Sequence, residues 1–298
     1  MANLREIRRR IKSIKNTAQI TKAMQMVAAS KMRKAQQQAL ASAPYQRILD
    51  HIARSLHEAR SGADLTHPLL DARPLRRQTI VLITTDKGLC GALNSNLLRE
   101  TLKYEKESPD VSFDYITIGR KGRQFIARLG RSLTADFELK ESFGFRDTKK
   151  ISQFLIQSFL DNQTDKIIVA YSEFINTLAQ KPVLTQLLPL GSAATVTTSA
   201  LSDASPSDNS PVAQYLFEPH PVELLNNMLP YFVHYSLYQK VLSARASEHS
   251  ARMVAMKNAT DNAQTIIKEL TLDYNKQRQA NITTELLEIA TAQMAMNQ

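Results

Sequence analysis

The chain has 298 residues, of which 38 are Lys or Arg and 28 are Asp or Glu, and its formal net charge is +10. Because 43% of the residues are hydrophobic and only 22% are charged, the composition excludes a wholly disordered chain and predicts a packed core. The single cysteine, Cys90, excludes an intramolecular disulfide and fits a reducing compartment.

The excess positive charge is confined to one end of the sequence. Residues 1–60 hold 13 basic and 3 acidic side chains, whereas residues 61–298 hold 25 of each. A basic segment of this kind indicates an acidic partner: nucleic acid, an anionic membrane surface or an acidic protein. No apolar run reaches the roughly 18–20 residues that cross a bilayer, so we expect a soluble chain that meets a membrane only through its partners.

Residues 1–60 are expected to form one long helix. They contain no glycine, and their only proline, Pro44, predicts a bend or a local break in that helix. Apolar, small and a few polar residues recur in alternating steps of three and four, which is the spacing of a coiled-coil seam. The seam positions are Leu4, Ile7, Ile11, Ile14, Ala18, Thr21, Gln25, Ala28, Met32 and Ala35.

The C-terminal segment, 220–290, has the same character. From residue 231 onward, 68 residues contain neither glycine nor proline, and one helix of that length would extend for roughly 100 Å, too far to fit inside a globule of this chain's size. An antiparallel coiled coil of the two chain ends is the simplest arrangement, and two ordinary amphipathic helices on a core are the alternative. The second seam is Leu242, Ala246, His249, Met253, Met256, Thr260, Ala263, Ile267, Leu270 and Tyr274.

Between residues 75 and 218 the pattern changes to short apolar runs that alternate with helical stretches, which predicts an α/β domain with a largely parallel sheet. Residues 192–211, with nine Ser or Thr and two Pro, are expected to form a flexible loop. The expected strands are 79–85, 113–118, 167–171, 183–190 and 214–217, and the expected helices begin at about Ala92 and span 120–129 and 148–160.

Two glycine-containing segments, Gly88–Gly91 and Gly119–Gly122, follow strands at the position where α/β domains bind nucleotides. Neither contains a phosphate-loop motif, so a plain tight turn is the favoured interpretation. A zinc-protease motif and G-x-S-x-G are also missing from the sequence, and one cysteine cannot build a cysteine zinc site. We therefore expect no catalytic residue, no bound cofactor and no metal site in this chain.

Four segments resemble one family closely. Ile20-Thr-Lys-Ala-Met-Gln-Met-Val-Ala-Ala-Ser-Lys-Met-Arg-Lys34 resembles the N-terminal signature of the gamma subunit of F-type ATP synthase, of the bacterial type. The segments 247–262 and 274–285 resemble its C-terminal signature, and Thr85-Asp-Lys-Gly-Leu-Cys-Gly-Ala-Leu-Asn94 resembles its D-R-G-L-C-G-G-L-N turn, with Lys87 and Ala92 as departures.

The resemblance implies a fold in which a long antiparallel two-helix coiled coil stands on a central Rossmann-like α/β domain. It also implies a non-catalytic rotor that transmits rotation of a membrane c-ring to a hexamer of alpha and beta subunits, with ATP chemistry on beta. The implied partners are alpha, beta, epsilon and the c-ring, without nucleic acid. The implied location is the cytoplasmic face of the bacterial inner membrane, reached through the complex.

The resemblance also implies roles for individual residues. Those expected to contact the alpha/beta hexamer are Met24, Lys22, Arg252, Arg278, Gln279 and Thr283. Met24 lies off the seam, so its side chain is expected to be exposed. Tyr215 and Glu218 are expected in the foot that meets the c-ring and epsilon. Asp86, Lys87, Gly88, Cys90 and Gly91 form the turn motif, in which Lys87 keeps the charge of the family's arginine without its planar fork.

Two other classes of function are weighed against the rotor. The basic N-terminal helix is compatible with nucleic-acid binding, although residues 1–43 contain no aromatic side chain for base stacking. A nucleotide-dependent enzyme built on the central sheet is the third hypothesis, and it lacks its phosphate loop. Two measurements distinguish the rotor from a nucleic-acid-binding protein. Co-purification with alpha and beta supports the rotor, and retention of the isolated helix on DNA supports nucleic-acid binding.

Overall fold

The computed structural model describes residues 4–60, 67–190 and 221–296. The first and last elements along the chain are two long helices, α1 (Leu4–Arg60) and α5 (Pro221–Met296). By their contacts the residues divide into two compact units, one made of 1–29 with 252–298 and the other of 30–251. Within the part of the chain that is described, no helix has both the length and the hydropathy to cross a bilayer.

The second unit is built on a five-stranded sheet. Its strands are β1 (Arg77–Ile83), β2 (Ser112–Ile118), β3 (Leu133–Phe137), β4 (Lys166–Phe174) and β5 (Gln180–Leu188). Their order is β3-β2-β1-β4-β5, and all neighbours run parallel except β4 and β5, which form an antiparallel pair. The predicted α/β fold class with a largely parallel sheet is therefore confirmed.

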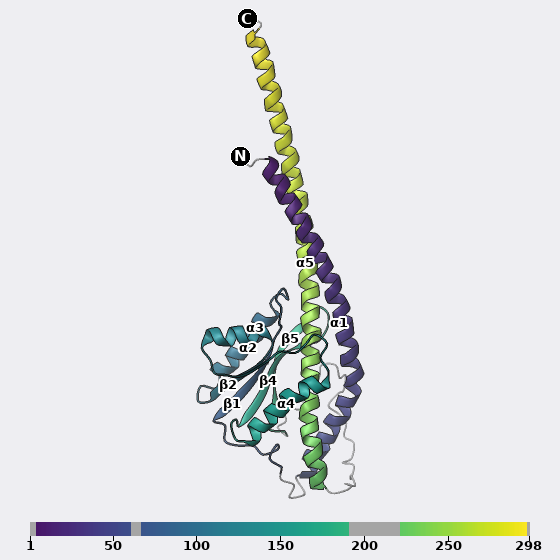
Figure 1. Ribbon diagram of the computed structural model, residues 1–298, viewed down its shortest axis with the longest axis vertical. Helices are drawn as coiled ribbons and strands as arrows, with labels where there is room; N and C mark the ends of the chain where they lie inside the picture. The colour runs from purple at the N-terminus through teal and green to yellow at the C-terminus, as the bar shows by residue number, and fades with distance from the viewer. Residues whose placement is uncertain (1–3, 61–66, 191–220, 297–298) are drawn as a thin grey trace. The chain divides into compact units, whose positions relative to one another are not determined.

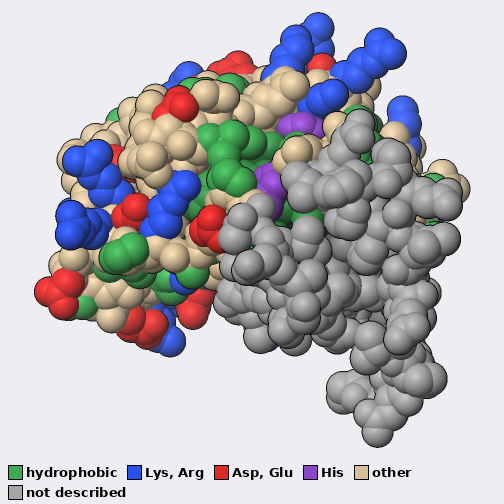
Figure 2. Space-filling view, turned by 90° about the horizontal axis from the view of Figure 1, so that it is seen from below, with side chains coloured by type: hydrophobic (Ala, Val, Ile, Leu, Met, Phe, Trp, Pro, Cys, Tyr) green, Lys and Arg blue, Asp and Glu red, His purple; other side chains and the backbone are tan. Residues whose placement is uncertain are grey.

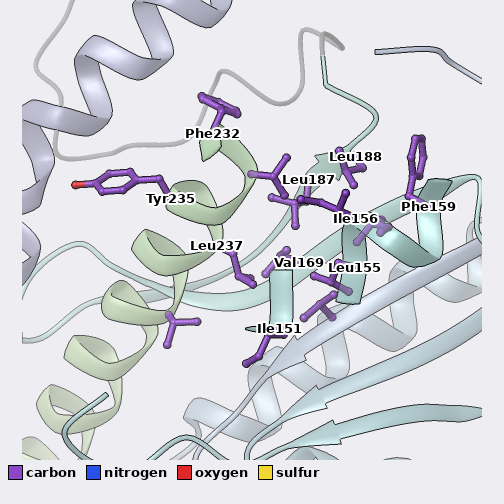
Figure 3. Packing of buried hydrophobic residues seen from close by; sticks show 14 of the residues in the cluster. Ile151, Leu155, Ile156, Phe159, Val169, Leu187, Leu188, Phe232, Tyr235 and Leu237 are labelled. Atoms are coloured by element: carbon purple, nitrogen blue, oxygen red, sulfur yellow. The ribbon is translucent and has the colours of Figure 1, made fainter. Parts of the chain in front are cut away.

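Helices cover both faces of this sheet (Figure 1). On one face α2 (Leu93–Lys106) and α3 (Arg120–Leu129) pack through Leu97 and Ile126 against Ile80, Leu82 and Tyr115. On the other face lie α4 (Phe145–Leu160) and the first part of α5, as Figure 3 shows. The buried side chains of α5 in this second core are Leu225, Leu229, Phe232, Val233, Tyr235, Leu237, Val241 and Ala244.

Helix α5 is thus a structural layer of the α/β domain over residues 225–244. Figure 3 shows Leu237 directed toward Val169 of β4, with Ile151 and Leu155 of α4 close by. Burial of apolar surface of this extent is the main stabilising contribution to such a domain. The sequence pattern predicted only a coiled-coil helix for this segment, and the structure adds its role in the core.

Two details differ from the expected elements, and two expected segments are not described by the structure. The edge strand β3 was not predicted, because Thr134 and Asp136 interrupt its apolar residues and none of its five residues is fully buried. Helix α4 begins at Phe145, three residues earlier than expected, since the Asp147 carboxylate accepts a hydrogen bond from the Gly144 N–H (2.9 Å) and caps the first turn. The strand predicted at 214–217 and the loop at 192–211 lie outside the described residues.

Helix α1 continues through Pro44 without a break, contrary to one of the two outcomes predicted there. The neighbouring Tyr45 ring packs edge-on against Tyr231 and Tyr235 of α5, with centroids 6.2 and 4.9 Å away. The Tyr235 hydroxyl donates to the Ser42 carbonyl oxygen at 2.8 Å. These contacts from α5 support the helix at the turn where proline removes a backbone donor.

The first unit consists of paired helical segments. In α1, every seam position from Leu4 to Ala28 is buried or half-buried, while the basic side chains between them are exposed. The hydroxyls of Thr21 and Thr260 meet at 2.7 Å across the two helices. The predicted stripe is therefore the packing face, and the positive charge of the N-terminal segment lies on its flanks.

Candidate functional site

The carboxyl edge of the sheet is where an open α/β fold binds its ligand, at the point where the strand order reverses. In this chain that point lies between β1 and β4, and helix α5 covers it. The space that remains has a volume of about 10 Å³, which accommodates one water molecule at most. Its lining includes Thr84 and Asn94 from the β1 side and Arg245 and Glu248 from α5. The position of a nucleotide is thus filled by the protein itself.

Arg245 forms the centre of this edge. Its Nη2 donates to Asp86 Oδ2 (3.3 Å) and to the Leu139 carbonyl oxygen (3.1 Å), and its Nη1 donates to Glu248 Oε2 (2.9 Å). The three side chains are largely buried, with exposed fractions of 15% for Arg245, 28% for Asp86 and 6% for Glu248. Charge-assisted bonds in a partly dehydrated setting are stronger than surface ion pairs.

The turn 85–94 is held by its own side chains. Asn94 Nδ2 donates to Thr85 Oγ1 (2.8 Å), and Thr85 Oγ1 donates to the Lys87 carbonyl oxygen (2.7 Å). Cys90 is 3% exposed and accepts a weak hydrogen bond from Asn94 Nδ2 at 3.5 Å. Gly91 adopts the left-handed conformation (φ 61°), which glycine takes without steric cost. This turn is therefore a tight structural turn, as predicted.

The N-terminus of α3 is the second place where a phosphate would be expected. Its amides are already paired: Arg120 N–H with Asp86 Oδ1 (3.2 Å), Lys121 N–H with the Thr85 carbonyl oxygen (3.1 Å), and Gly122 N–H with Thr84 Oγ1 (2.8 Å). A Cβ at Gly119 would lie 2.3 Å from the Thr84 carbonyl oxygen, so this glycine permits the close approach of α3 to β1. Gly119 therefore serves the packing of α3 on β1, and the first amides of α3 are used in hydrogen bonds to residues 84–86.

A second ion pair reaches the same edge from α1. Lys31 Nζ pairs with a carboxylate oxygen of Glu141, in the segment that joins β3 to α4. The hydrogen bond from Lys31 holds the pKa of Glu141 below its ordinary value, and the charges of Lys87 and His249 act in the same direction. Among the residues that the structure describes, no group of His, Cys, Asp and Glu is arranged to hold a metal ion.

The residues expected to meet a hexamer lie on the first unit. Lys22 is exposed, and its Nζ donates to Gln25 Oε1 at 3.4 Å. Met24 is half-buried, which differs from the exposed position expected for it, whereas Met26 is 60% exposed. Arg252 is half-buried and engaged with a neighbour.

Beyond Gln277 the character of α5 changes, because every described side chain from Arg278 to Met294 is exposed. This segment includes Gln279 and Thr283, and the Thr283 hydroxyl donates to the Gln279 carbonyl oxygen at 2.9 Å. The large apolar side chains exposed on it are Ile282, Leu286, Leu287, Ile289 and Met294. An apolar helix end that none of the described residues of the chain covers is typical of a surface that another protein covers.

The remaining residues fall into two groups. Tyr215 and Glu218, expected at the foot, lie outside the described residues. Arg245, Glu248 and the Lys31–Glu141 pair were not singled out from the sequence. The spacing of Arg245 and Glu248 on one helix is visible in the sequence, but nothing there connects Arg245 with Asp86, which lies 159 positions away.

On the end of the molecule shown in Figure 2, basic and acidic side chains are interspersed.

Comparison with known proteins gives consistent matches over nearly the whole chain. A family model described as ATP synthase matches residues 3–296. The chain is 49% identical to the ATP synthase gamma chain of Methylacidiphilum infernorum, over 99% of this chain and 100% of the relative, and 47% identical to that of Opitutus terrae, over 99% of both. Its fold is similar to a chain of the Euglena gracilis mitochondrial ATP synthase (OSCP/F1/c-ring), with a TM-score of 0.66 at 20% identity, over 98% of this chain and 94% of that one.

Proposed function

Because the chain belongs to the family of ATP synthase gamma chains, we propose that it is the rotor of a proton-translocating F-type ATP synthase. In this proposal it transmits the rotation of a c-ring to a catalytic hexamer of alpha and beta subunits. The conformational cycle of the beta sites follows from that rotation, and the chain itself carries out no chemistry. The complex lies on the cytoplasmic face of a bacterial inner membrane.

The observation that carries the proposal is that α5 has two stretches with different surroundings. One uninterrupted helix of 76 residues is built into the core of the α/β domain at Leu225–Ala244 and ends in a segment, 278–294, whose side chains are all exposed. A continuous hydrogen-bonded helix is a stiff element. A force applied to the domain therefore has a covalent and helical route to the exposed end.

The two kinds of surface fit two kinds of partner. The exposed end, with Ile282, Leu286 and Leu287, suits an apolar sleeve that a turning shaft contacts without specific hydrogen bonds. Lys22, Met24, Arg252, Arg278, Gln279 and Thr283 are the proposed contacts with alpha and beta. The basic flank of α1 suits acidic loops of beta. Tyr215 and Glu218 are the proposed contacts with the c-ring and epsilon.

Protein side chains fill the carboxyl edge of the sheet, and this supports the proposal that the chain is not catalytic. Arg245 and Glu248 occupy the space in which an α/β enzyme would bind a nucleotide, and the amides of α3 are bonded to Asp86, Thr85 and Thr84. ATP hydrolysis is accordingly assigned to beta, and no cofactor is assigned to this chain.

The first test is co-purification of the tagged chain with alpha and beta subunits. We expect a stable complex that hydrolyses ATP and, once joined to its membrane sector, pumps protons. Retention on DNA that falls with rising salt, together with no binding to the hexamer, would show a nucleic-acid-binding protein instead.

The second test concerns Met24. Met24→Lys places a charge beside Lys22 on the helix flank, and we expect it to lower the protons pumped per ATP while the complex still assembles. Met26→Lys is the matched control, since it adds the same charge to the same helix at an exposed position. Equal losses in both variants would contradict a specific contact at Met24.

A further inference from the structure

Three segments at the carboxyl edge of the sheet contact α5 just beyond Ala244, the last residue of α5 in the apolar core of the domain. They are the turn 85–91 after β1, the segment 138–144 after β3 and the turn 175–179 after β4, and together we call them the collar. Because β1, β3 and β4 run in the same direction, the segments that follow them lie at the same edge. In other α/β folds such loops bind the ligand. Here they contact a helix of the same chain.

Arg245 connects two of the three segments with α5. Its guanidinium bonds Asp86 in the first segment and the Leu139 carbonyl oxygen in the second, and it lies 6.0 Å from the centre of the Phe143 ring. Glu248, one turn further along α5, fixes the other side of the guanidinium at 2.9 Å. The planar fork of arginine makes these bonds directional, which lysine cannot reproduce.

The third segment contacts α5 through serine hydroxyls. Ser250 Oγ donates to the Thr177 carbonyl oxygen at 2.7 Å, and the backbone N–H of Phe174, at the end of β4, donates to Ser243 Oγ at 3.0 Å. The turn is itself held by Asn176, whose Oδ1 accepts the N–H groups of Leu178 and Ala179 at 2.9 and 2.7 Å. Within eight residues of α5, Arg245 and Ser250 thus make polar contacts with the collar, and Ser243 makes one with the end of β4.

The two kinds of contact along α5 resist different motions. The apolar contacts of 225–244 hold the helix on the sheet, but the hydrophobic effect has no preferred direction. Hydrogen bonds weaken steeply when their geometry changes, so the collar opposes rotation of α5 about its own axis. Lys31, which pairs with Glu141 of the second segment, ties α1 to the same collar.

We propose that Arg245 is a positioning residue that fixes the rotational setting of α5 against the α/β domain. A torque applied to the α/β domain is then transmitted to α5 without rotation of the helix relative to the sheet. This inference rests on the rotor function proposed above. Removing the guanidinium would leave Asp86 and Glu248 as neighbouring carboxylates without their shared cation, which disfavours the docked position.

The test uses the complete complex in sealed vesicles, with ATP-driven proton pumping measured against an increasing opposing membrane potential. The variants are Arg245→Met and Arg245→Lys. The matched control is Arg131→Met, because Arg131 pairs with Glu105 at 2.8 Å inside the α/β domain and neither residue belongs to the collar. Hydrogen exchange of the amides in 241–250 reports the docking of α5.

For Arg245→Met we expect assembly and ATP hydrolysis to persist, while protons pumped per ATP fall as the opposing potential rises. Amide exchange in 241–250 should be at least about tenfold faster, because loss of one charge-assisted hydrogen bond corresponds to that factor and the guanidinium makes three. Arg245→Lys should fall between Arg245→Met and the parent chain. The parent chain and Arg131→Met should keep a constant number of protons pumped per ATP, because a general loss of stability does not depend on the opposing potential.

The outcomes separate this inference from the rotor proposal. If the parent chain pumps no protons, the proposed function fails. If it pumps and Arg245→Met follows it at every potential, only the positioning role is overturned. Should Arg245→Met fail to assemble, Asp86→Asn weakens the same contact and keeps the oxygen that accepts the Arg120 N–H. If that variant also fails to assemble while Arg131→Met assembles, the contact is needed for folding and the positioning role is overturned.

Discussion

The two ends of α5 share one local structure and have opposite surroundings. Leu237 is 0% exposed among side chains of α4 and the sheet, whereas Leu286, on the same helix, is 61% exposed. From 231 to 296 the helix contains neither glycine nor proline, so its helical propensity is high at both places. Propensity thus explains why α5 is a helix at all, but it does not explain what each end does.

The difference lies in what each stretch packs against. The stretch 225–244 lies in the core of a domain, 252–277 has one buried stripe, and 278–294 has none. Burial therefore falls in steps along one helix. Stability of the chain should depend on the first stretch and binding of other proteins on the last, and each of the following substitutions tests part of that statement.

The largest effect is expected at Gly119. Its φ of 107° and the 2.3 Å approach of a Cβ to the Thr84 carbonyl oxygen leave no room for a side chain, so Gly119→Ala should lower the free energy of unfolding by about 4 kcal/mol or more. Gly88→Ala is the control, because its Cβ would meet only the far end of Lys121 at 4.0 Å. Similar urea midpoints for both variants would show that the approach of α3 to β1 is not tight.

The next effect compares leucines on one helix. Leu237→Ala leaves a cavity in the core and should cost about 3 kcal/mol of unfolding free energy. Leu286→Ala should cost less than about 0.5 kcal/mol in the isolated chain, yet weaken its binding to the alpha/beta hexamer. If Leu286→Ala destabilises the isolated chain as much as Leu237→Ala does, the two ends do not differ as described.

A smaller effect should follow pH. Burial, together with the charge of Lys149, lowers the pKa of His234 from 6.5 to about 4, and its Nδ1 lies 2.6 Å from Ser152 Oγ of α4. The unfolded state then binds more protons between pH 6.5 and 4, so the stability contribution of neutral His234 is complete above pH 6.5 and is lost as the pH falls toward 4.

His234→Gln removes this titration and should flatten the pH dependence of unfolding free energy in that window. The measurement is urea unfolding at pH 7 and at pH 4.5 for both chains. An equal loss of stability in the variant would assign the pH dependence to other groups.

The smallest effect is expected at the paired stripe. Thr260→Val removes the cross-helix partner of Thr21 and should cost about 1 kcal/mol. The double variant with Thr21→Val should cost less than the sum of the two single changes, because each single change already breaks the same contact. Additive costs, measured by thermal unfolding of the four chains, would show that the two hydroxyls do not interact.

The sequence predicted those features that depend on local pattern. The three-and-four spacing identified the packing stripe of α1, and the apolar runs identified β1, β2 and β4, because both signals come from neighbouring residues. The family was identified correctly from the signatures at the two ends and the turn. The antiparallel direction of β5 could not be predicted, since an apolar run does not show which way a strand runs.

The candidate site was predicted less completely, because its contacts join distant segments. The tight turn at 85–94 could be predicted from its glycines, but the contact of Asp86 with Arg245 depends on how α5 crosses the sheet. Met24 was expected to be exposed and is half-buried, since its neighbour Gln25 is on the packing stripe and the helix turns only about 100° per residue. The contact roles of Lys22, Arg252, Arg278, Gln279 and Thr283 stay predictions.

The most direct measurement of the rotor proposal follows a label on the chain within an immobilised alpha/beta hexamer. Asp110→Cys offers an exposed attachment point on the α/β domain, and Cys90 is buried and should not compete for the label. The account predicts that the label turns in one direction when ATP is added and stops when ATP is removed. A label that stays at a fixed angle while the same complexes hydrolyse ATP would contradict it.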